Sequence, residues 1–153
     1  MSNLMSMGVT GSRYRPGSDQ LHGFGGVLVA LLWRGVWEFR HGACVGADEE
    51  MAARSSARGL WTVAHPPINE RLLSSRALEV SDELEDADEY LARNRAIVDA
   101  VDVLVALPRR FVEERRSGTW ATVRYSRQVL TPVVIVWPDG TVDDDESVMS
   151  GGG

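Results

Sequence analysis

The sequence predicts an α/β protein built on a parallel sheet that is covered by helices on both faces. Short apolar segments that resemble buried strands alternate five times with longer segments whose apolar residues recur at helical spacing. Each pair of parallel strands needs a crossover connection, so this alternation is typical of parallel sheets. We therefore predict a three-layer sandwich with a five-stranded parallel sheet of order 3-2-1-4-5 and right-handed crossovers.

The predicted strands are short apolar runs that end in small, polar or proline-containing turns. The first is predicted at Val9 and Thr10, immediately before Gly11. The others are predicted at residues 37–41, 60–64, 101–107 and 132–137.

Helices are predicted between these strands from their apolar spacing and end signals. The first ends at Gly35, and the second is predicted to start with Asp48 as its capping residue and to end at Gly59. A third carries Arg93, and a fourth follows Ser117. Residues 68–88 give no clear pattern; a loop this long is usually functional or mobile.

The length of 153 residues suits one domain with a single core. Residues 1–7 are predicted as a flexible N-terminus and residues 8–140 as the domain. Residues 141–153 are predicted as a disordered tail, because this segment is acidic and ends in glycines.

Composition excludes several classes of function. The net charge of −6 and pI near 5.0 make nucleic-acid binding unlikely, since that binding depends on basic surface. All 16 basic residues are arginine, which excludes a P-loop lysine and a Schiff-base lysine. Arginine favours bidentate phosphate recognition, although a GC-rich genome gives the same bias. No signal peptide or membrane span is visible, and the single Cys44 fits a reducing compartment, so we expect a cytoplasmic protein.

Several small or polar segments follow the predicted strands, at the edge where parallel sheets bind ligands. They are Gly11 to Arg13, His41 to Asp48, His65 with Pro66, and Ser117 to Thr122. Their convergence on one edge predicts a binding site.

Two elements indicate an anion at this site. Arg93 and Asn94 are polar groups on the inward face of an amphipathic helix, where burial without partners is costly. Ser117, Gly118 and Thr119 would offer free backbone amides and two hydroxyls at a helix start, which favours phosphate. We expect the phosphate between this helix start and the loop after the first strand.

Other interpretations remain open for individual residues. The Gly11 segment also fits a tight turn, and Gly42 and Gly46 fit strand-to-helix geometry as well as close approach of a ligand. Asp48 suits a helix cap or a ribose-binding carboxylate. Cys44 is expected to be a packed residue, and the three histidines have no metal-binding spacing.

Four motifs together resemble the SLOG superfamily of Rossmann-like proteins. They are residues 9–13, residues 41–48, Arg93-Asn94 with Ile97-Val98, and residues 117–122. The last two are most similar to the DNA-processing protein A pattern R-N-x-x-I followed by S-G-S/T-x-x-T. The resemblance implies a Rossmann-like fold, binding of nucleotides or nucleotide-derived ligands, and self-association.

One departure affects the expected activity. The LONELY GUY-type phosphoribohydrolases of this superfamily are known by P-G-G-x-G-T-x-x-E, whose glutamate is catalytic, and that position is Thr122 here. Binding of a nucleotide-like ligand is therefore the leading function. N-glycosidic hydrolysis, with Asp48 or the acidic loop as a substitute carboxylate, and a DNA-associated accessory role are the alternatives.

The predicted partners are a nucleotide-like small molecule and a homodimer or higher homo-oligomer, without a membrane. No catalytic residue, metal ligand or cofactor is predicted. The predicted ligand-binding residues are Gly11, Ser12, Arg13, Gly42, Gly46, Asp48, Arg93, Asn94, Ser117, Gly118, Thr119 and Thr122.

Overall fold

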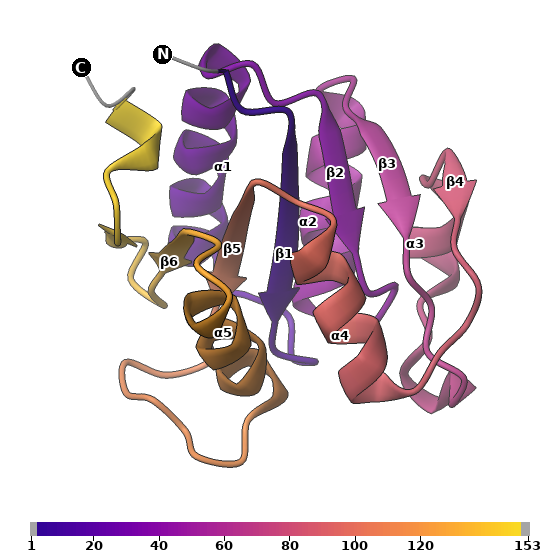
Figure 1. Cartoon of the computed structure of the whole chain (residues 1–153). Helices are drawn as coiled ribbons and strands as arrows, with labels where there is room; N and C mark the ends of the chain where they lie inside the picture. Colours follow the sequence, from indigo (N-terminus) through magenta and orange to yellow (C-terminus); the bar gives the residue numbers. More distant parts are fainter. Residues whose placement is uncertain (1–2, 151–153) are drawn as a thin grey trace.

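The computed structural model describes residues 3–150 and confirms an α/β fold around a mostly parallel sheet (Figure 1). The sheet has seven strands, in the order β4-β3-β2-β1-β5-β6-β7, and only β7 runs antiparallel to its neighbour. The strands are β1 (Ser6–Gly11), β2 (Glu38–His41), β3 (Trp61–Ala64), β4 (Glu83–Leu84), β5 (Val103–Leu107), β6 (Val133–Val136) and β7 (Val142–Asp144).

The prediction of five strands was wrong, because the two edge strands were missed. The five predicted strands correspond to β1, β2, β3, β5 and β6 and lie in the predicted order. Both β4 and β7 lie in acidic segments and pair on one side only. An edge strand with a solvated face needs no apolar run, so neither segment showed the strand pattern.

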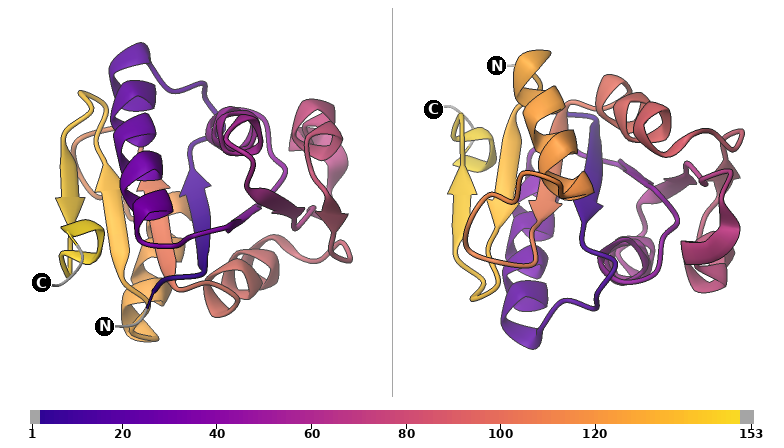
Figure 2. Two further views of the ribbon diagram at one scale, coloured as in Figure 1. Left: turned by 90° about the horizontal axis from the view of Figure 1, so that it is seen from above. Right: turned by 90° about the horizontal axis from the view of Figure 1, so that it is seen from below.

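The helices form two layers around the sheet, with α1 and α2 on one face and α4 and α5 on the other (Figure 2). The segment 68–88 forms a 3₁₀ turn, the short α3 against α2, and β4. The helical elements are α1 (Ser18–Trp33), α2 (Ala47–Ala57), η1 (Glu70–Leu72), α3 (Ser75–Glu79), α4 (Tyr90–Asp99), α5 (Gly118–Gln128) and η2 (Val148–Ser150).

The core has two parts, one on each face of the sheet. Alternate residues of a strand point to opposite faces. Val103 and Val105 of β5 pack in the cluster that contains Phe24 of α1. Leu104 and Ala106, the alternate residues of the same strand, pack in the other cluster, with Trp120 and Val123 of α5. Central strands buried on both faces explain the continuous apolar runs of the sequence.

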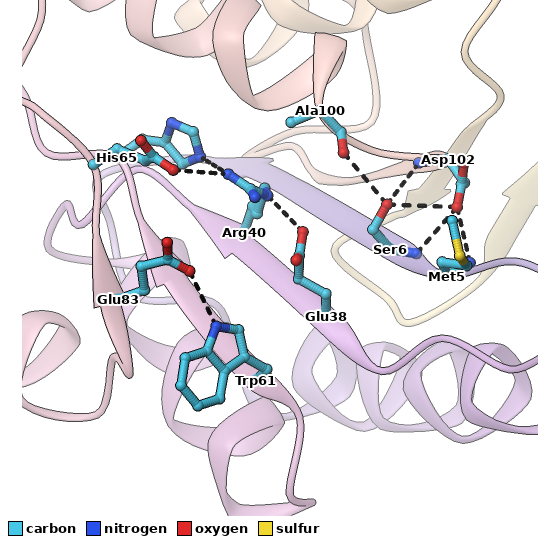
Figure 3. A network of polar contacts seen from close by, with 10 residues as sticks. Met5, Ser6, Glu38, Arg40, Trp61, His65, Glu83, Ala100 and Asp102 are labelled. Carbon is cyan, nitrogen blue, oxygen red and sulfur yellow. Dashed lines mark hydrogen bonds and ion pairs between the residues drawn. The ribbon is translucent and has the colours of Figure 1, made fainter.

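The structure differs from the predicted ends of the domain. β1 starts at Ser6, and the Asp102 carboxylate accepts the backbone N–H groups of Met5 and Ser6 at 2.8 and 3.2 Å (Figure 3). β7 and η2 occupy most of residues 142–150, which were predicted as part of a disordered tail. Asp144 accepts the backbone N–H groups that start η2, so its charge orders this segment. Residues 1–2 and 151–153, also assigned to flexible ends, lie outside the described residues.

In residues 3–150, no helix combines the length and the apolar character that crossing a membrane requires. Self-association stays a prediction. Among the large apolar side chains that could contribute to an interface, Trp33 and Trp61 are exposed, whereas Trp120 is buried in the core.

Candidate functional site

A small cavity of about 40 Å³ lies at the carboxyl ends of β1 and β2, beneath the first turns of α4. It adjoins a larger cavity of about 440 Å³, and the two share Arg13, Cys44, Leu72 and Tyr90 in their walls. The structure brings together six of the predicted site residues around the small cavity: Gly11, Arg13, Gly42, Asp48, Arg93 and Asn94.

Arg93 is the more buried of the two arginines that line this cavity, and the residue as a whole is 3% exposed. Its Nη1 donates to the backbone carbonyls of Gly42 and His65, the latter at 3.3 Å, at the ends of β2 and β3. Its Nε has no hydrogen-bond partner in the described residues, and no carboxylate lies within ion-pair distance. A buried cation held mainly by carbonyl oxygens keeps capacity for an anion.

The sequence of α4 places Arg93 in the cavity. Ile97 and Val98 follow Arg93 and Asn94 at helical spacing and bury the same face. Gly8 of β1 lets this face approach the sheet, because a β-carbon there would lie 2.7 Å from Cγ2 of Ile97. Helix packing therefore positions the guanidinium.

Asp48 is not the N-cap of α2, so this prediction is corrected. The cap is Gly46, at a φ of 93°, and its N–H is accepted by Glu49 at 3.4 Å. Asp48 instead lies within the first turn of the helix, and its Oδ2 accepts the N–H of Cys44 at 3.4 Å. Burial raises the pKa of Asp48 to about 6, although the charge of Arg93 and the backbone hydrogen bonds oppose this shift. The cavity thus has a carboxyl group that exchanges a proton close to neutral pH.

Cys44 was expected to be a packed residue, but it lies beside Arg93 at the cavities. Its Sγ is 3.7 and 3.8 Å from the two terminal nitrogens of Arg93, and it lines both cavities. Burial, together with the charge of Asp48, raises the pKa of the thiol, so it stays protonated at neutral pH. Sequence reasoning missed its place because Arg93 is far from it along the chain.

The two histidines nearby are neutral and structural. Burial lowers the pKa of His41 to about 3; its Nδ1 accepts the N–H of Ala43, and its Nε2 lies 2.8 Å from Oγ of Ser81. Burial also lowers the pKa of His65 to about 4, and its ring faces Arg40 at 3.1 Å (Figure 3). Within residues 3–150, neither ring lines the two cavities.

The loop after β1 is tied to the start of α2. The backbone carbonyl of Ser12 accepts the N–H of Ala47 at 2.9 Å, and its hydroxyl accepts the N–H of Tyr14 at 3.1 Å. Gly46 has no room for a β-carbon against the backbone of Ser12 and Arg13. Ser12 and Gly46 therefore shape the loop that carries Arg13, rather than lining the cavity themselves.

The start of α5 lies apart from the cavity around Arg93. Ser117 caps the helix by accepting the N–H of Trp120 at 3.3 Å. The hydroxyl of Thr122 donates to the carbonyl of Gly118 at 2.9 Å. Tyr90 covers Gly118, since a β-carbon there would collide with the tyrosine hydroxyl. Within residues 3–150, none of Ser117, Gly118, Thr119 and Thr122 lines either cavity.

Tyr90 connects the two parts of the predicted site. Its ring lies under the guanidinium of Arg93, with 4.9 Å between Cζ and the ring centroid, and its hydroxyl lies against Gly118. Tyr90 and Arg93 are three residues apart, and this helical spacing was the sequence signal that the two side chains share one face of α4. The walls formed by residues 67–72 and by Asp88 and Glu89 had no such signal, because tertiary contacts bring them to the site.

Fold and cavities together define an α/β protein with two adjoining cavities at the carboxyl edge of its sheet, the edge at which such sheets commonly bind ligands. No protein-family model and no curated protein matches the sequence, but solved structures do.

The molybdenum cofactor binding protein from Rippkaea orientalis has a TM-score of 0.66 at 20% identity, over 98% of this chain and 82% of that one. The Moco carrier protein from Chlamydomonas reinhardtii has a TM-score of 0.58 at 18% identity, over 95% of this chain and 82% of that one. DNA processing protein A from Streptococcus pneumoniae has a TM-score of 0.65 at 16% identity, over 86% of this chain but only 50% of that one. The likeness confirms the Rossmann-like fold that the resemblance to the SLOG superfamily predicted.

Proposed function

We propose that this protein binds a nucleotide or a nucleotide-derived ligand, and that Arg93 holds its phosphate or another acid group at the small cavity. The larger adjoining cavity then receives the rest of the ligand. Its volume of about 440 Å³ lies within the range of small-molecule sites, roughly 300–1,000 Å³.

The observation that carries this proposal is the state of Arg93. Arg93 is 3% exposed and has no carboxylate within ion-pair distance among residues 3–150, which is an energetically costly arrangement that an anionic ligand would relieve. Asp48 compensates the charge only in part, because its raised pKa leaves it partly protonated near pH 6.

The similar structures add one ligand to the candidates. Two of them are named as molybdenum cofactor binding and carrier proteins, so that cofactor belongs in a ligand panel beside the mononucleotides. At 20% identity and below, the comparison supports a shared fold and leaves the ligand to be measured.

Hydrolysis of an N-glycosidic bond is the second candidate, and Asp48 is the observation that favours it. A buried carboxyl group with a pKa of about 6 can act as a general acid or base close to neutral pH. Thr122 supplies no carboxylate, and its hydroxyl is used within α5. Release of free base from nucleoside monophosphates, followed by chromatography, separates turnover from binding.

Calorimetry with a panel of mononucleotides tests the proposal on the parent protein and on Arg93→Ala. A charge-assisted bond to an anion is worth roughly 1.5–3 kcal/mol, so the loss should weaken binding about tenfold to a hundredfold. Arg93→Lys should rescue poorly, because lysine lacks the planar fork.

The matched control is Arg95→Ala. Arg95 is an exposed arginine of the same helix, and its guanidinium stacks on Tyr125. Thermal unfolding of each variant shows whether it remains folded. A folded Arg93→Ala or Arg93→Lys that binds as tightly as the parent would place the anion elsewhere.

A further inference from the structure

We propose that the larger cavity selects a base with two adjacent N–H donors on one edge, as guanine has, and that the Glu89 carboxylate reads this edge. The inference rests on the proposed function, since the phosphate end of the ligand must lie at Arg93. It adds a substrate class and a residue that determines specificity.

The larger cavity has walls suited to a flat ring. Leu72 and Tyr90 form its boundary with the small cavity, and Ile68 lies on the opposite segment of the chain. Aromatic and branched apolar side chains bind a planar base through its faces and leave its edge for polar contacts. A ligand whose phosphate reaches Arg93 therefore places its base beside Tyr90.

Glu89 lines the larger cavity at the start of α4. It directly precedes α4, and its carbonyl accepts the N–H of Arg93 at 2.8 Å, so the two residues lie one helical turn apart. Its carboxylate makes neither a hydrogen bond nor an ion pair with any group of residues 3–150. Arg13 and Arg71 line the same cavity without pairing with it.

The backbone around Glu89 is held in place. Asp88 accepts the N–H of Glu89 through Oδ1 at 2.8 Å, and its own backbone bonds to Pro66 and Ile68 at 3.2 and 3.0 Å. These contacts join the start of α4 to the opposite wall of the cavity. Asp88 therefore positions the wall, and Glu89 is the carboxylate that remains for a ligand.

The chemistry of a carboxylate decides which base fits. Its two oxygens accept two parallel hydrogen bonds, and an edge with adjacent N–H donors satisfies both. Guanine offers N1–H and the 2-amino group, hypoxanthine offers N1–H alone, and adenine turns the lone pair of N1 toward the oxygens. Good bidentate pairing discriminates between bases by roughly 1–3 kcal/mol, which is about five- to a hundredfold in affinity. Because Glu89 is exposed, we expect the lower part of that range.

The test is calorimetry with GMP, 2′-deoxy-GMP, IMP and AMP on the full chain. GMP and its deoxy form should bind equally and about tenfold more tightly than IMP or AMP. Glu89→Gln should lower GMP affinity to the level of IMP without weakening AMP, because the amide can donate to the N1 lone pair of adenine. The control is Asp86→Asn, which neutralises an exposed carboxylate of the same acidic run that lines neither cavity.

Each contrary outcome has a distinct meaning. Equal binding of all four nucleotides, with Arg93→Ala weakening all of them, overturns the base selection and leaves the proposed function standing. A deoxy form that binds as weakly as AMP shows that the 2′-hydroxyl of the ribose, and not the base edge, determines the affinity difference, which also overturns it. Absence of binding by any of the four, on protein shown to be folded, overturns the base selection and restricts the proposed function to the other ligands of the panel.

Discussion

Two glycines at the carboxyl edge of the sheet, Gly42 and Gly118, were expected to expose backbone to a ligand, and the structure uses them differently. Gly42 receives the guanidinium of Arg93, and Gly118 receives the ring of Tyr90. Both incoming side chains belong to the first turn of α4. Each glycine therefore admits a side chain of this helix, and only at Gly42 does the incoming group bring a positive charge.

The difference separates the proposed anion site from an ordinary helix start. Around Gly42, a buried cation has carbonyl partners and no carboxylate within ion-pair range. Around Gly118, the cap Ser117 and the cover Tyr90 satisfy or shield the groups that the sequence offered to phosphate. A free helix N-terminus favours anions, but its amides have to be reachable.

The largest effect is expected for Gly42→Ala. A β-carbon at this position would collide with Nη1 of Arg93 and lie 2.8 Å from Oδ2 of Asp48. The guanidinium must leave its two carbonyls, so calorimetry should show affinity falling by about tenfold to a hundredfold, with a stability cost of about 1–3 kcal/mol in urea denaturation.

The control for that variant is Gly25→Ala, because a β-carbon on Gly25 of α1 would meet no atom within 4 Å. It should leave affinity unchanged and increase stability by about 0.5–1 kcal/mol, as alanine does in helices. A folded Gly42→Ala with parental affinity would remove the distinction between the two glycines.

The second effect concerns how the stability of the folded protein depends on pH through the titration of Asp48. Its pKa of about 6 in the folded protein exceeds its ordinary value of 3.8, so the folded state binds this proton more tightly than the unfolded chain. The resulting stability is complete below about pH 4 and is lost as pH rises through 6. Asp48→Asn abolishes this titration, so the stability of the variant relative to the parent should rise by about 2 kcal/mol between pH 4 and pH 7.5.

Urea denaturation at the two pH values measures this difference. Asp86→Asn, which also removes one negative charge but from an exposed position, reports the effect of net charge alone. Parallel stability profiles for Asp48→Asn and the parent would show that Asp48 does not titrate near neutral pH and would weaken its case as an acid or base.

The sequence predicted the central layers of the fold better than its edges or its cavities. The apolar runs of β1, β5 and β6 are buried strands, and burial on both faces produces that pattern. The polar edge strands β4 and β7 depend on backbone pairing and carry no comparable pattern.

For the site, residues on one regular element were predictable and contacts between elements were not. The inward face of α4 at Arg93 and Asn94 follows from helical spacing. The interpretation of Asp48 as a cap followed a correct local preference, but Gly46, with its positive φ, starts the helix two residues earlier. The approach of Cys44 to Arg93 and the cover of Tyr90 over Gly118 are tertiary contacts, which local patterns do not encode.

The smallest effect, and the one that most sharply divides the two glycines, is expected for Ser117→Ala. The hydroxyl accepts the N–H of Trp120 at 3.3 Å, and loss of such a cap costs about 1 kcal/mol of stability. Ligand affinity should stay unchanged, because Ser117 lines neither cavity. Ser117→Thr, which keeps the hydroxyl, should restore stability in urea denaturation. If instead Ser117→Ala weakens ligand binding about tenfold while Ser117→Thr does not, the start of α5 contacts the ligand, Tyr90 must move to admit it, and the two glycines belong to one anion site.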